Sequence, residues 1–350
     1  MPNKSKGIVV LSLFNGMSTG HTALDNVGIK VDKYYSSEIK PAAIKLTQHH
    51  YPDTIQLGDV EKWKEWDIDW KNVDLVLSGS PCQDLSIAGA SAGKRLGLEG
   101  SRSSLFFVFV DILNYVKQLN PNVLFLQENV GSAPKKDVGI MSSELGVYPV
   151  KINSKLVTAQ LRNRYYWSNI ITRQDGLFGD TITDIPQPKD RKIMFKDIVQ
   201  NGAVKVDKSV CLLERTIASA SYKDMNSDKA QKFLKERESR SMMSLIYKDK
   251  HNCLMEHYQR SYAFGDKTSK KWQDYARKRV KNTGTATLIA KDGLVRIVNK
   301  VEMCRLQGFP DDWCDILTDV EAGSLLGDGW TLPIIEHIFS YIGDNNAEQK

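Results

Sequence analysis

The feature that most constrains the fold of this chain is an alternation of short apolar runs and helical segments that starts at residue 7. The runs have the length and the β-branched content of buried strands. They occupy residues 8–14, 33–37, 55–57, 73–77 and 123–127. Helices are expected at 21–27 and 103–119. This alternation predicts an α/β fold, in which ligands bind beyond the carboxyl ends of the strands.

Cys82 follows the run at 73–77, within the segment SGSPCQD of residues 78–84. Because only a thiolate is a good nucleophile, a reactive cysteine needs a site that favours loss of its proton, or a substrate that helps to remove it. The alternative is a buried structural cysteine, which is the better interpretation of an isolated cysteine. The segments around Cys82 therefore decide between the two.

Three further segments place polar groups at the same predicted edge of the sheet. Residues 15–20, NGMSTG, form a glycine turn between the first run and the first helix, although they lack the dinucleotide pattern G-x-G-x-x-G. Glu38 ends the second run, and Asp59 follows the third. Carboxylates at these points accept hydrogen bonds from ribose hydroxyls. The combination favours an adenosine-containing cofactor over three unrelated surface turns.

Glu128 follows the run at 123–127 and is therefore expected at the edge that carries Cys82. A carboxyl group beside a nucleophilic thiol can protonate or hold the ring under attack, although an acid that caps a loop is the alternative. Residues 84–103 contain four glycines and several basic residues. They are typical of a mobile loop that closes over a substrate and contacts phosphates, with an inert surface loop as the alternative.

Gln160, Arg162 and Arg164 alternate along a predicted strand within residues 157–170. Alternate residues of a strand share one face, so these side chains can hold an anion or the carbonyl of a base. The alternative is an exposed basic edge strand.

Residues 171–283 lose the alternation of strands and helices, and aromatic residues there are interleaved with lysine and arginine. Between residues 171 and 300 there are 27 Lys+Arg against 16 Asp+Glu, a net charge of +11, which leaves −5 for the rest of a chain whose total is +6. A basic segment in a mildly acidic body favours a polyanion as partner. We interpret it as a separate, irregular domain suited to nucleic acid, with a solvated lysine-rich surface as the alternative.

The composition excludes several classes of protein. No apolar run approaches the length of a membrane span, and the apolar segment near the N-terminus is too short for a signal peptide. Five scattered cysteines without a Cys-x-x-Cys pair argue against a disulfide framework and against a zinc site. We therefore expect a cytosolic protein without a metal, and a monomer by default.

Several motifs occur in one fixed order along the chain. They are F-x-G at 14–16, Glu38, Asp59, PCQ at 81–83, ENV at 128–130, Q-x-R-x-R at 160–164 and RLQGFP at 305–310. The ordered set resembles the cytosine-5 DNA methyltransferase family. The resemblance implies a Rossmann-like, S-adenosylmethionine-dependent methyltransferase domain with a smaller, irregular target-recognition domain. The parts would be a catalytic and cofactor-binding domain at 7–170, the recognition domain at 171–283, and a segment at 284–343 that completes the catalytic domain.

The family transfers a methyl group from S-adenosylmethionine to C5 of a cytosine flipped out of duplex DNA, and S-adenosylhomocysteine is the product. By resemblance, Cys82 attacks C6 of the base, and Glu128 holds N3 and the exocyclic amine. Arg164 would contact the base carbonyl, and Arg162 would support the site near the thiol. The positions that match cofactor contacts are Phe14, Asn15, Gly16, Met17, Thr19, Glu38, Ile39, Asp59, Val60, Ser80, Pro81, Leu105 and Trp330. The positions expected to contact DNA are Gln83, Ser86, Lys94, Arg95, Asn129 and Gln160.

Two cofactor motifs depart from the usual bacterial pattern. Ser18 and Thr19 stand where many bacterial members have a second glycine, and DGW at 328–330 stands where Gly-Asn-Ser is usual. Both variants are similar to the mammalian de novo branch, whereas the short chain is similar to bacterial or phage enzymes. A cytoplasmic enzyme of a bacterium or a phage-infected host is expected, with restriction-modification, protection of phage DNA and regulation as open roles.

Two rival functions share these motifs. A tRNA cytosine-5 methyltransferase has the same catalytic residues, but that branch typically carries a Cys-Phe-Thr tripeptide, which is missing from this sequence. A catalytically silent DNA-binding relative is disfavoured by the intact Cys82, Glu128 and Arg164.

Overall fold

The computed structural model describes most of the chain outside two long segments. The described residues are 7–81, 105–176, 179–200, 204, 207–210, 227–239, 246–247, 295–296 and 298–343. Cys82, Gln83, Ser86, Lys94 and Arg95, which the sequence predicts for catalysis and DNA contact, lie outside them. Among the described helices, none combines the length and the apolar character that a bilayer span requires.

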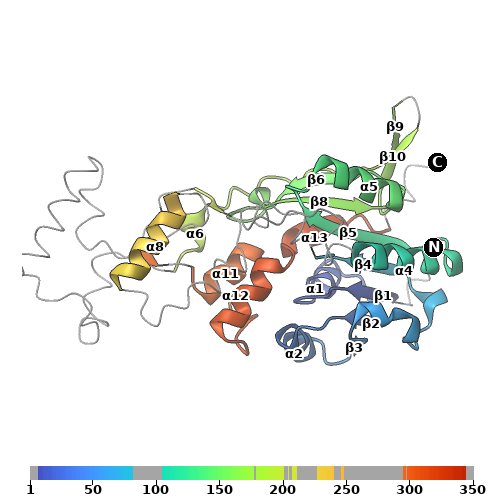
Figure 1. Cartoon of the computed structure of the whole chain (residues 1–350), viewed down its shortest axis with the longest axis horizontal. Helices are drawn as coiled ribbons and strands as arrows, with labels where there is room; N and C mark the ends of the chain where they lie inside the picture. Colours follow the sequence, from blue (N-terminus) through green and yellow to red (C-terminus); the bar gives the residue numbers. More distant parts are fainter. Residues whose placement is uncertain are drawn as a thin grey trace, which may run out of the picture.

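The centre of the molecule is a seven-stranded sheet with the strand order β3-β2-β1-β4-β5-β8-β6 (Figure 1). The strands from β3 to β5 are parallel, and β8 runs antiparallel to both β5 and β6. The bounds are β1 Ile8–Leu13, β2 Val31–Ser37, β3 Ile55–Gln56, β4 Leu75–Ser78, β5 Leu124–Val130, β6 Val150–Asn153 and β8 Asn163–Ser168. The order reverses between β1 and β4, where open α/β sheets bind their ligands. The predicted α/β fold is confirmed.

Two buried clusters cover the two faces of the sheet. The first contains residues of α1 Thr19–Asn26, α2 Pro41–His50, α11 Lys300–Gln307, α12 Asp319–Asp328 and α13 Leu332–Phe339. The second contains residues of α4 Leu105–Leu119, α5 Lys135–Leu145 and the 3-10 helix η1 Val60–Glu65. Val10 and Leu75 join the first cluster, whereas Val9 and Leu11 join the second. Because both faces are buried, the central strands are apolar at nearly every position, which makes them recognisable in the sequence.

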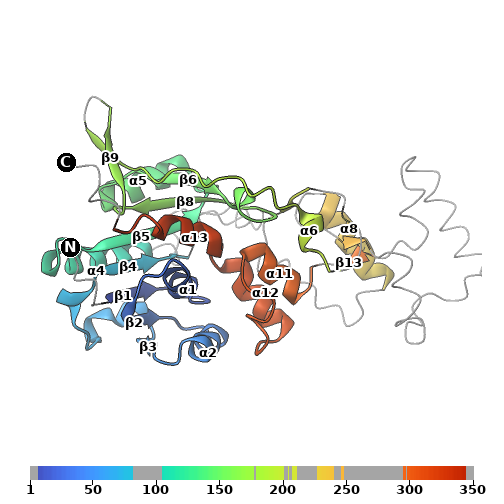
Figure 2. The ribbon, with the colours of Figure 1, turned by 180° about the vertical axis from the view of Figure 1, so that it is seen from behind.

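In both views α11 and α12 lie between the sheet and the segment that carries α6 Phe195–Ile198 and α8 Asp228–Ser239 (Figures 1 and 2). Phe195 of α6 belongs to the same buried cluster as Leu306 of α11 and Phe339 of α13. The first part of the predicted recognition domain therefore shares a core with the catalytic body. The domain division at residue 171 stays a prediction.

A short parallel pairing joins β11 Ser209–Val210 to β7 Gln160–Leu161. Lys208, immediately before β11, donates hydrogen bonds to the backbone oxygens of residues 155 and 158 at 2.9 and 3.2 Å, and to that of Ile193. Burial lowers the pKa of this ammonium group. These contacts anchor residues 208–210 beside the strand that begins the motif Q-x-R-x-R of residues 160–164.

The motif RLQGFP has a clear packing role at the end of α11. The helix begins at a capping box, in which Asn299 and Glu302 each accept a backbone hydrogen bond from the other at 2.9 Å. It ends at Gly308, whose φ of 82° lies in the left-handed region. A Cβ at this position would overlap the ring of Pro333 in α13. Glycine at residue 308 therefore both ends α11 and lets α13 approach it closely.

The structure corrects two points of the sequence analysis. β5 extends to Val130, so Glu128 lies within the strand and pairs with Tyr166 of β8 rather than following the strand. The alternative of an exposed basic edge strand is wrong, because β8 has β5 on one side and β6 on the other. Elements not anticipated are α2, α5, α12, β6 and the hairpin of β9 Thr172–Asp175 with β10 Asp180–Thr183.

Candidate active site

Glu128 is the centre of a polar network at the carboxyl end of β4 and β5. Its side chain is nearly buried, and its two carboxylate oxygens have different partners. Nε of Arg164 lies 2.7 Å from Oε1, and the indole Nε1 of Trp330 donates to Oε2 at 3.1 Å. Since a carboxylate accepts about four hydrogen bonds, lone pairs remain for a ligand. The geometry fits a carboxylate that holds a ring by its polar edge.

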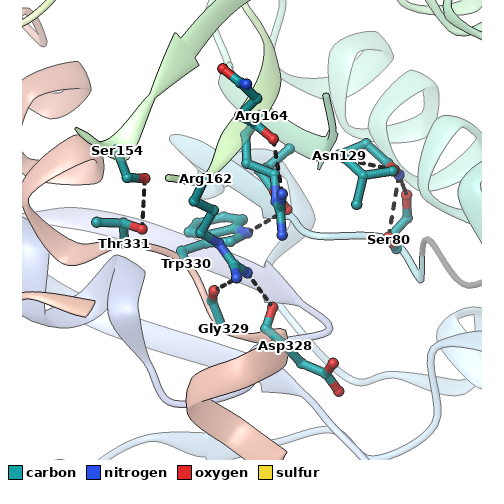
Figure 3. A network of polar contacts seen from close by, with 12 residues as sticks. Ser80, Asn129, Ser154, Arg162, Arg164, Asp328, Gly329, Trp330 and Thr331 are labelled. Atoms are coloured by element: carbon teal, nitrogen blue, oxygen red, sulfur yellow. Dashed lines mark hydrogen bonds and ion pairs between the residues drawn. The ribbon is translucent and has the colours of Figure 1, made fainter. Parts of the chain in front are cut away.

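Arg162 and Arg164 have separate roles although they lie on the same face of the chain. Arg162 is 2% exposed, and its guanidinium donates to the backbone oxygens of Gly327 at 3.1 Å and Gly329 at 2.7 Å, with Asp328 at 3.5 Å (Figure 3). These carbonyls are at the C-terminal end of α12, where a cation is electrostatically favoured. The predicted role of Arg162 as a support is consistent with this geometry.

Trp330 lies where the segment after α12 meets the end of β4. A Cβ added to Gly79 would be 2.7 Å from Nε1 of Trp330 and 3.2 Å from its Cε2. The indole therefore packs directly against the backbone of the strand that leads to Cys82. The sequence analysis missed both the contact of Trp330 with Glu128 and the need for glycine at residue 79. The only signal for Gly79 was a small residue next to the Pro-Cys motif.

Two polar side chains of β5 hold Ser80, the second residue before Cys82. Nε2 of Gln127 donates to Oγ of Ser80 at 2.8 Å. Nδ2 of Asn129 reaches Oγ of Ser80 at 3.3 Å and its backbone oxygen at 3.4 Å (Figure 3). Ser80, two residues before Cys82 in the sequence, is thus fixed to the strand that carries Glu128.

The two described residues that were expected to contact DNA are both buried. Asn129 is 1% exposed and is engaged with Ser80, and Gln160 is 0% exposed and donates to the backbone oxygen of Leu306 at 3.2 Å. Their observed contacts stabilise the protein itself. Direct contact of these side chains with DNA stays a prediction.

The cofactor edge is organised by Glu38. One carboxylate oxygen accepts the backbone N–H of Gly16 at 2.8 Å, and the other accepts those of Ile39 and Lys40 at 2.8 and 2.9 Å. The glycine turn is thereby tied to the end of β2. Positive φ values at Phe14, Gly16 and Ser18 of 56°, 57° and 58° give this turn its shape. These three backbone N–H groups use only part of the hydrogen-bonding capacity of the Glu38 carboxylate. The carboxylate can therefore still accept a hydrogen bond from a hydroxyl group.

The other predicted cofactor residues divide by exposure. Ile39 is 70% exposed, which is unusual for a large apolar side chain and fits a surface that covers a flat ring. Partly exposed at the same edge are Phe14, Gly16, Glu38, Asp59, Pro81, Leu105 and Trp330. The remaining residues are buried and can offer a ligand their backbone groups rather than their side chains: Asn15, Met17, Thr19, Val60 and Ser80. Asp59 also caps η1, because its Oδ1 accepts the N–H of Glu61 at 3.0 Å.

The described residues contain no group of three His, Cys, Asp or Glu side chains that could hold a metal ion. Both described cysteines are buried in the core: Cys304 lies within α11, and Cys314 follows that helix in the chain.

Comparisons with known proteins agree with this geometry. The chain is 36% identical over 215 residues to the type II methyltransferase M.NlaIV of Neisseria lactamica, covering 56% of this chain and 47% of that protein. It is 30% identical over 254 residues to the orphan methyltransferase M.SPRI of Bacillus phage SPR, covering 65% and 54%. The chain thus spans about half the length of these two curated relatives.

Solved structures show the same fold. The Entamoeba histolytica methyltransferase EhMeth superposes with a TM-score of 0.59 at 15% identity, covering 97% of this chain and 99% of that chain. A mutant of Spodoptera frugiperda DNMT2 gives 0.55 at 16% identity, covering 96% and 99%. Residues 8–344 match the family described as C-5 cytosine-specific DNA methylase. Because this match spans nearly the whole chain, the chain belongs to the C-5 cytosine-specific DNA methylase family.

Proposed function

We propose that this protein is a DNA (cytosine-5-)-methyltransferase that acts on a cytosine flipped out of duplex DNA. The observation that carries the proposal is the Glu128 carboxylate, held by Arg164 at 2.7 Å beside the fixed start of the cysteine loop, in a chain of this family. A carboxylate at this point fits the polar edge of a cytosine, and Cys82, two residues after Ser80 in the sequence, would supply the nucleophile.

We infer the chemistry of these residues from membership of the family. The thiolate of Cys82 forms a bond to C6, and the electron pair of the C5–C6 double bond moves toward C5 and the ring. Glu128 holds N3 and the exocyclic amine, which favours protonation of N3 while charge builds in the ring. After the methyl group is attached at C5, loss of the C5 proton restores the double bond and expels the thiolate, so that the cysteine is regenerated.

S-adenosylmethionine supplies the methyl group when it is bound. The residues at the cofactor edge fit it, because the Gly16 turn permits close approach, Glu38 and Asp59 can accept ribose hydroxyls, and the exposed Ile39 offers an apolar surface. These residues would bind and orient the donor, which would supply the methyl group.

A covalent trap tests the proposal. Duplex DNA with 5-fluorocytosine in the target site should form a denaturation-resistant adduct with the protein when S-adenosylmethionine is present, because fluorine blocks release of the cysteine. Cys82→Ala should form none, whereas Cys253→Ala, a matched change outside the motif, should still form it. An adduct with Cys82→Ala would refute the assignment. An adduct on tRNA and not on duplex DNA would favour the tRNA alternative.

We further propose that residues within 171–283 choose the target sequence. The excess positive charge supports this, since lysine and arginine supply the salt-dependent phosphate contacts of DNA-binding proteins. Because Ile185, Phe195 and Ile198 pack into the catalytic core, a chimera should keep residues 171–200 and exchange only 211–283 with a relative of known target. Bisulfite sequencing should then show the target of the relative. An active chimera that keeps the original target would place the choice elsewhere, most plausibly in the 84–103 loop.

A further inference from the structure

Trp330 makes the second hydrogen bond to the Glu128 carboxylate, although its motif assigns it to the methyl donor. The two residues are 202 positions apart in the chain, and the indole N–H points at Oε2 from 3.1 Å. Arg164 holds the opposite oxygen at 2.7 Å. Figure 3 shows the indole of Trp330 beside the side chains of Arg162 and Arg164.

Two donors on different oxygens fix a carboxylate more firmly than one donor does. The last torsion of a glutamate side chain is broad and two-fold, so a single contact leaves the carboxylate able to rotate. With Arg164 on Oε1 and Trp330 on Oε2, the plane of the Glu128 carboxylate is set. Each oxygen keeps lone-pair capacity for a further donor.

Trp330 is itself held from three directions. The guanidinium of Arg162 binds the backbone oxygen of Gly329, the residue before it, at 2.7 Å. The hydroxyl of Thr331, the residue after it, donates to Oε1 of Gln307 at 2.9 Å and accepts from Ser154 at 2.9 Å. The ring packs on Gly79. An indole fixed in this way can act as a rigid support for another side chain.

We propose that Trp330 is a positioning residue that sets the plane of the Glu128 carboxylate for the flipped cytosine through its indole N–H. The inference rests on the proposed function of Glu128. It predicts that loss of the N–H slows the chemical step, because the carboxylate then meets N3 and the amino group of the base in a distribution of orientations. It also predicts that an aromatic ring at residue 330 is sufficient for binding of the methyl donor.

The variant Trp330→Phe separates these two tasks, because it keeps a ring and removes the donor. Its affinity for S-adenosylmethionine, measured by isothermal titration, should stay within about twofold of the wild type. Its single-turnover rate of methylation at saturating DNA and donor should fall about 10- to 100-fold, the range for loss of one hydrogen bond to a charged group. Trp313→Phe is the matched control, because the N–H of Trp313 has no hydrogen-bond partner among the described residues.

A double-mutant cycle with Glu128→Gln shows whether Trp330 acts through Glu128. If it does, Trp330→Phe should cost much less in the Glu128→Gln background than in the wild type. Equal costs in the two backgrounds would overturn the proposal. An unchanged rate in Trp330→Phe, or a loss explained by weaker donor affinity, would overturn it as well.

A spectroscopic readout separates this inference from the proposed function. In protein labelled with ¹⁵N at the indoles, the Nε1–H resonance that disappears in Trp330→Phe should move upfield in Glu128→Gln, because a neutral acceptor replaces a charged one. The Trp313 resonance should not move. A Trp330 resonance indifferent to Glu128→Gln overturns the contact. A protein that shows the shift and yet methylates no cytosine contradicts the proposed function instead.

Discussion

Replacement of Arg162 by methionine should destabilise the protein, because its guanidinium holds the end of α12. The side chain is 2% exposed and donates two short hydrogen bonds to backbone oxygens, at 3.1 Å to Gly327 and 2.7 Å to Gly329. Hydrogen bonds that involve a charged group contribute about 1.5–3 kcal/mol each, so the two give a gross value of about 3–6 kcal/mol. Removal of the cation also removes its desolvation cost, which leaves about 2–4 kcal/mol as the expected net loss.

Urea unfolding of the wild type and of Arg162→Met measures this loss as a lower midpoint with an unchanged slope. Arg173→Met is the informative control, because Arg173 makes two ion pairs, with Asp175 and Asp184, but is fully exposed on the β9–β10 hairpin. Exposed ion pairs contribute little, so this variant should keep the wild-type midpoint. If Arg162→Met unfolds at the wild-type midpoint, the guanidinium does not hold the end of α12.

Three further predictions concern the cofactor edge, the cysteine loop and pH. Glu38→Ala should weaken S-adenosylmethionine binding by about 1.5–3 kcal/mol in isothermal titration, because a charge-assisted hydrogen bond is lost. Gly79→Ala should slow methylation and lower the free energy of unfolding by about 1–3 kcal/mol, because its Cβ would lie 2.7 Å from Nε1 of Trp330. Gly139→Ala is the control in thermal unfolding, because a Cβ at that position has no neighbour within 4 Å. Burial lowers the pKa of His21 in the native protein, so folding favours the neutral imidazole. The free energy of unfolding should therefore fall as the pH drops below 6.5, the pKa of histidine in the unfolded chain.

Each of these has an outcome that contradicts it. Unchanged donor affinity in Glu38→Ala would mean that this carboxylate does not contact the ribose. A Gly79→Ala protein with the melting temperature and rate of the wild type would show that the indole moves aside without cost. His21→Phe should remove part of the acid sensitivity below pH 6.5, because a phenyl ring keeps the stacking between two tyrosines but binds no proton. Equal acid sensitivity in both proteins would assign it to another group.

The parallel strands of the sheet were predictable because burial on both faces leaves a strong pattern. β1 and β4 are apolar along nearly their whole length, and Gly308 marks the end of α11 as its φ requires. The edge that carries Glu38, Asp59 and Glu128 followed from the rule that parallel strands present their carboxyl ends together.

The connections within the site were not predictable from the sequence. Alternation places Arg162 and Arg164 on one face, yet one guanidinium binds carbonyls of α12 and the other binds Glu128. The difference depends on how the segment after α12 packs over the sheet, which is a long-range property. The same holds for the contact between Trp330 and Glu128. Local sequence patterns indicate which side chains are buried and which face of a strand or helix they share. Contacts between residues far apart in the chain depend instead on how distant elements pack together.

The packing of α13 against α1 has a consequence for the order in which the protein is made. The two helices are separated by about 300 residues, and Nδ2 of Asn26 in α1 donates to Oε1 of Glu336 in α13 at 2.6 Å. At a synthesis rate of about 5–20 residues per second, the face of the sheet that α13 covers stays open for roughly 15–60 s after α1 is made. Trp330 precedes α13 directly, so the carboxylate of Glu128 also lacks its second donor during that interval. The nascent chain would therefore contain Cys82 well before Trp330 can complete the hydrogen bonds to the Glu128 carboxylate.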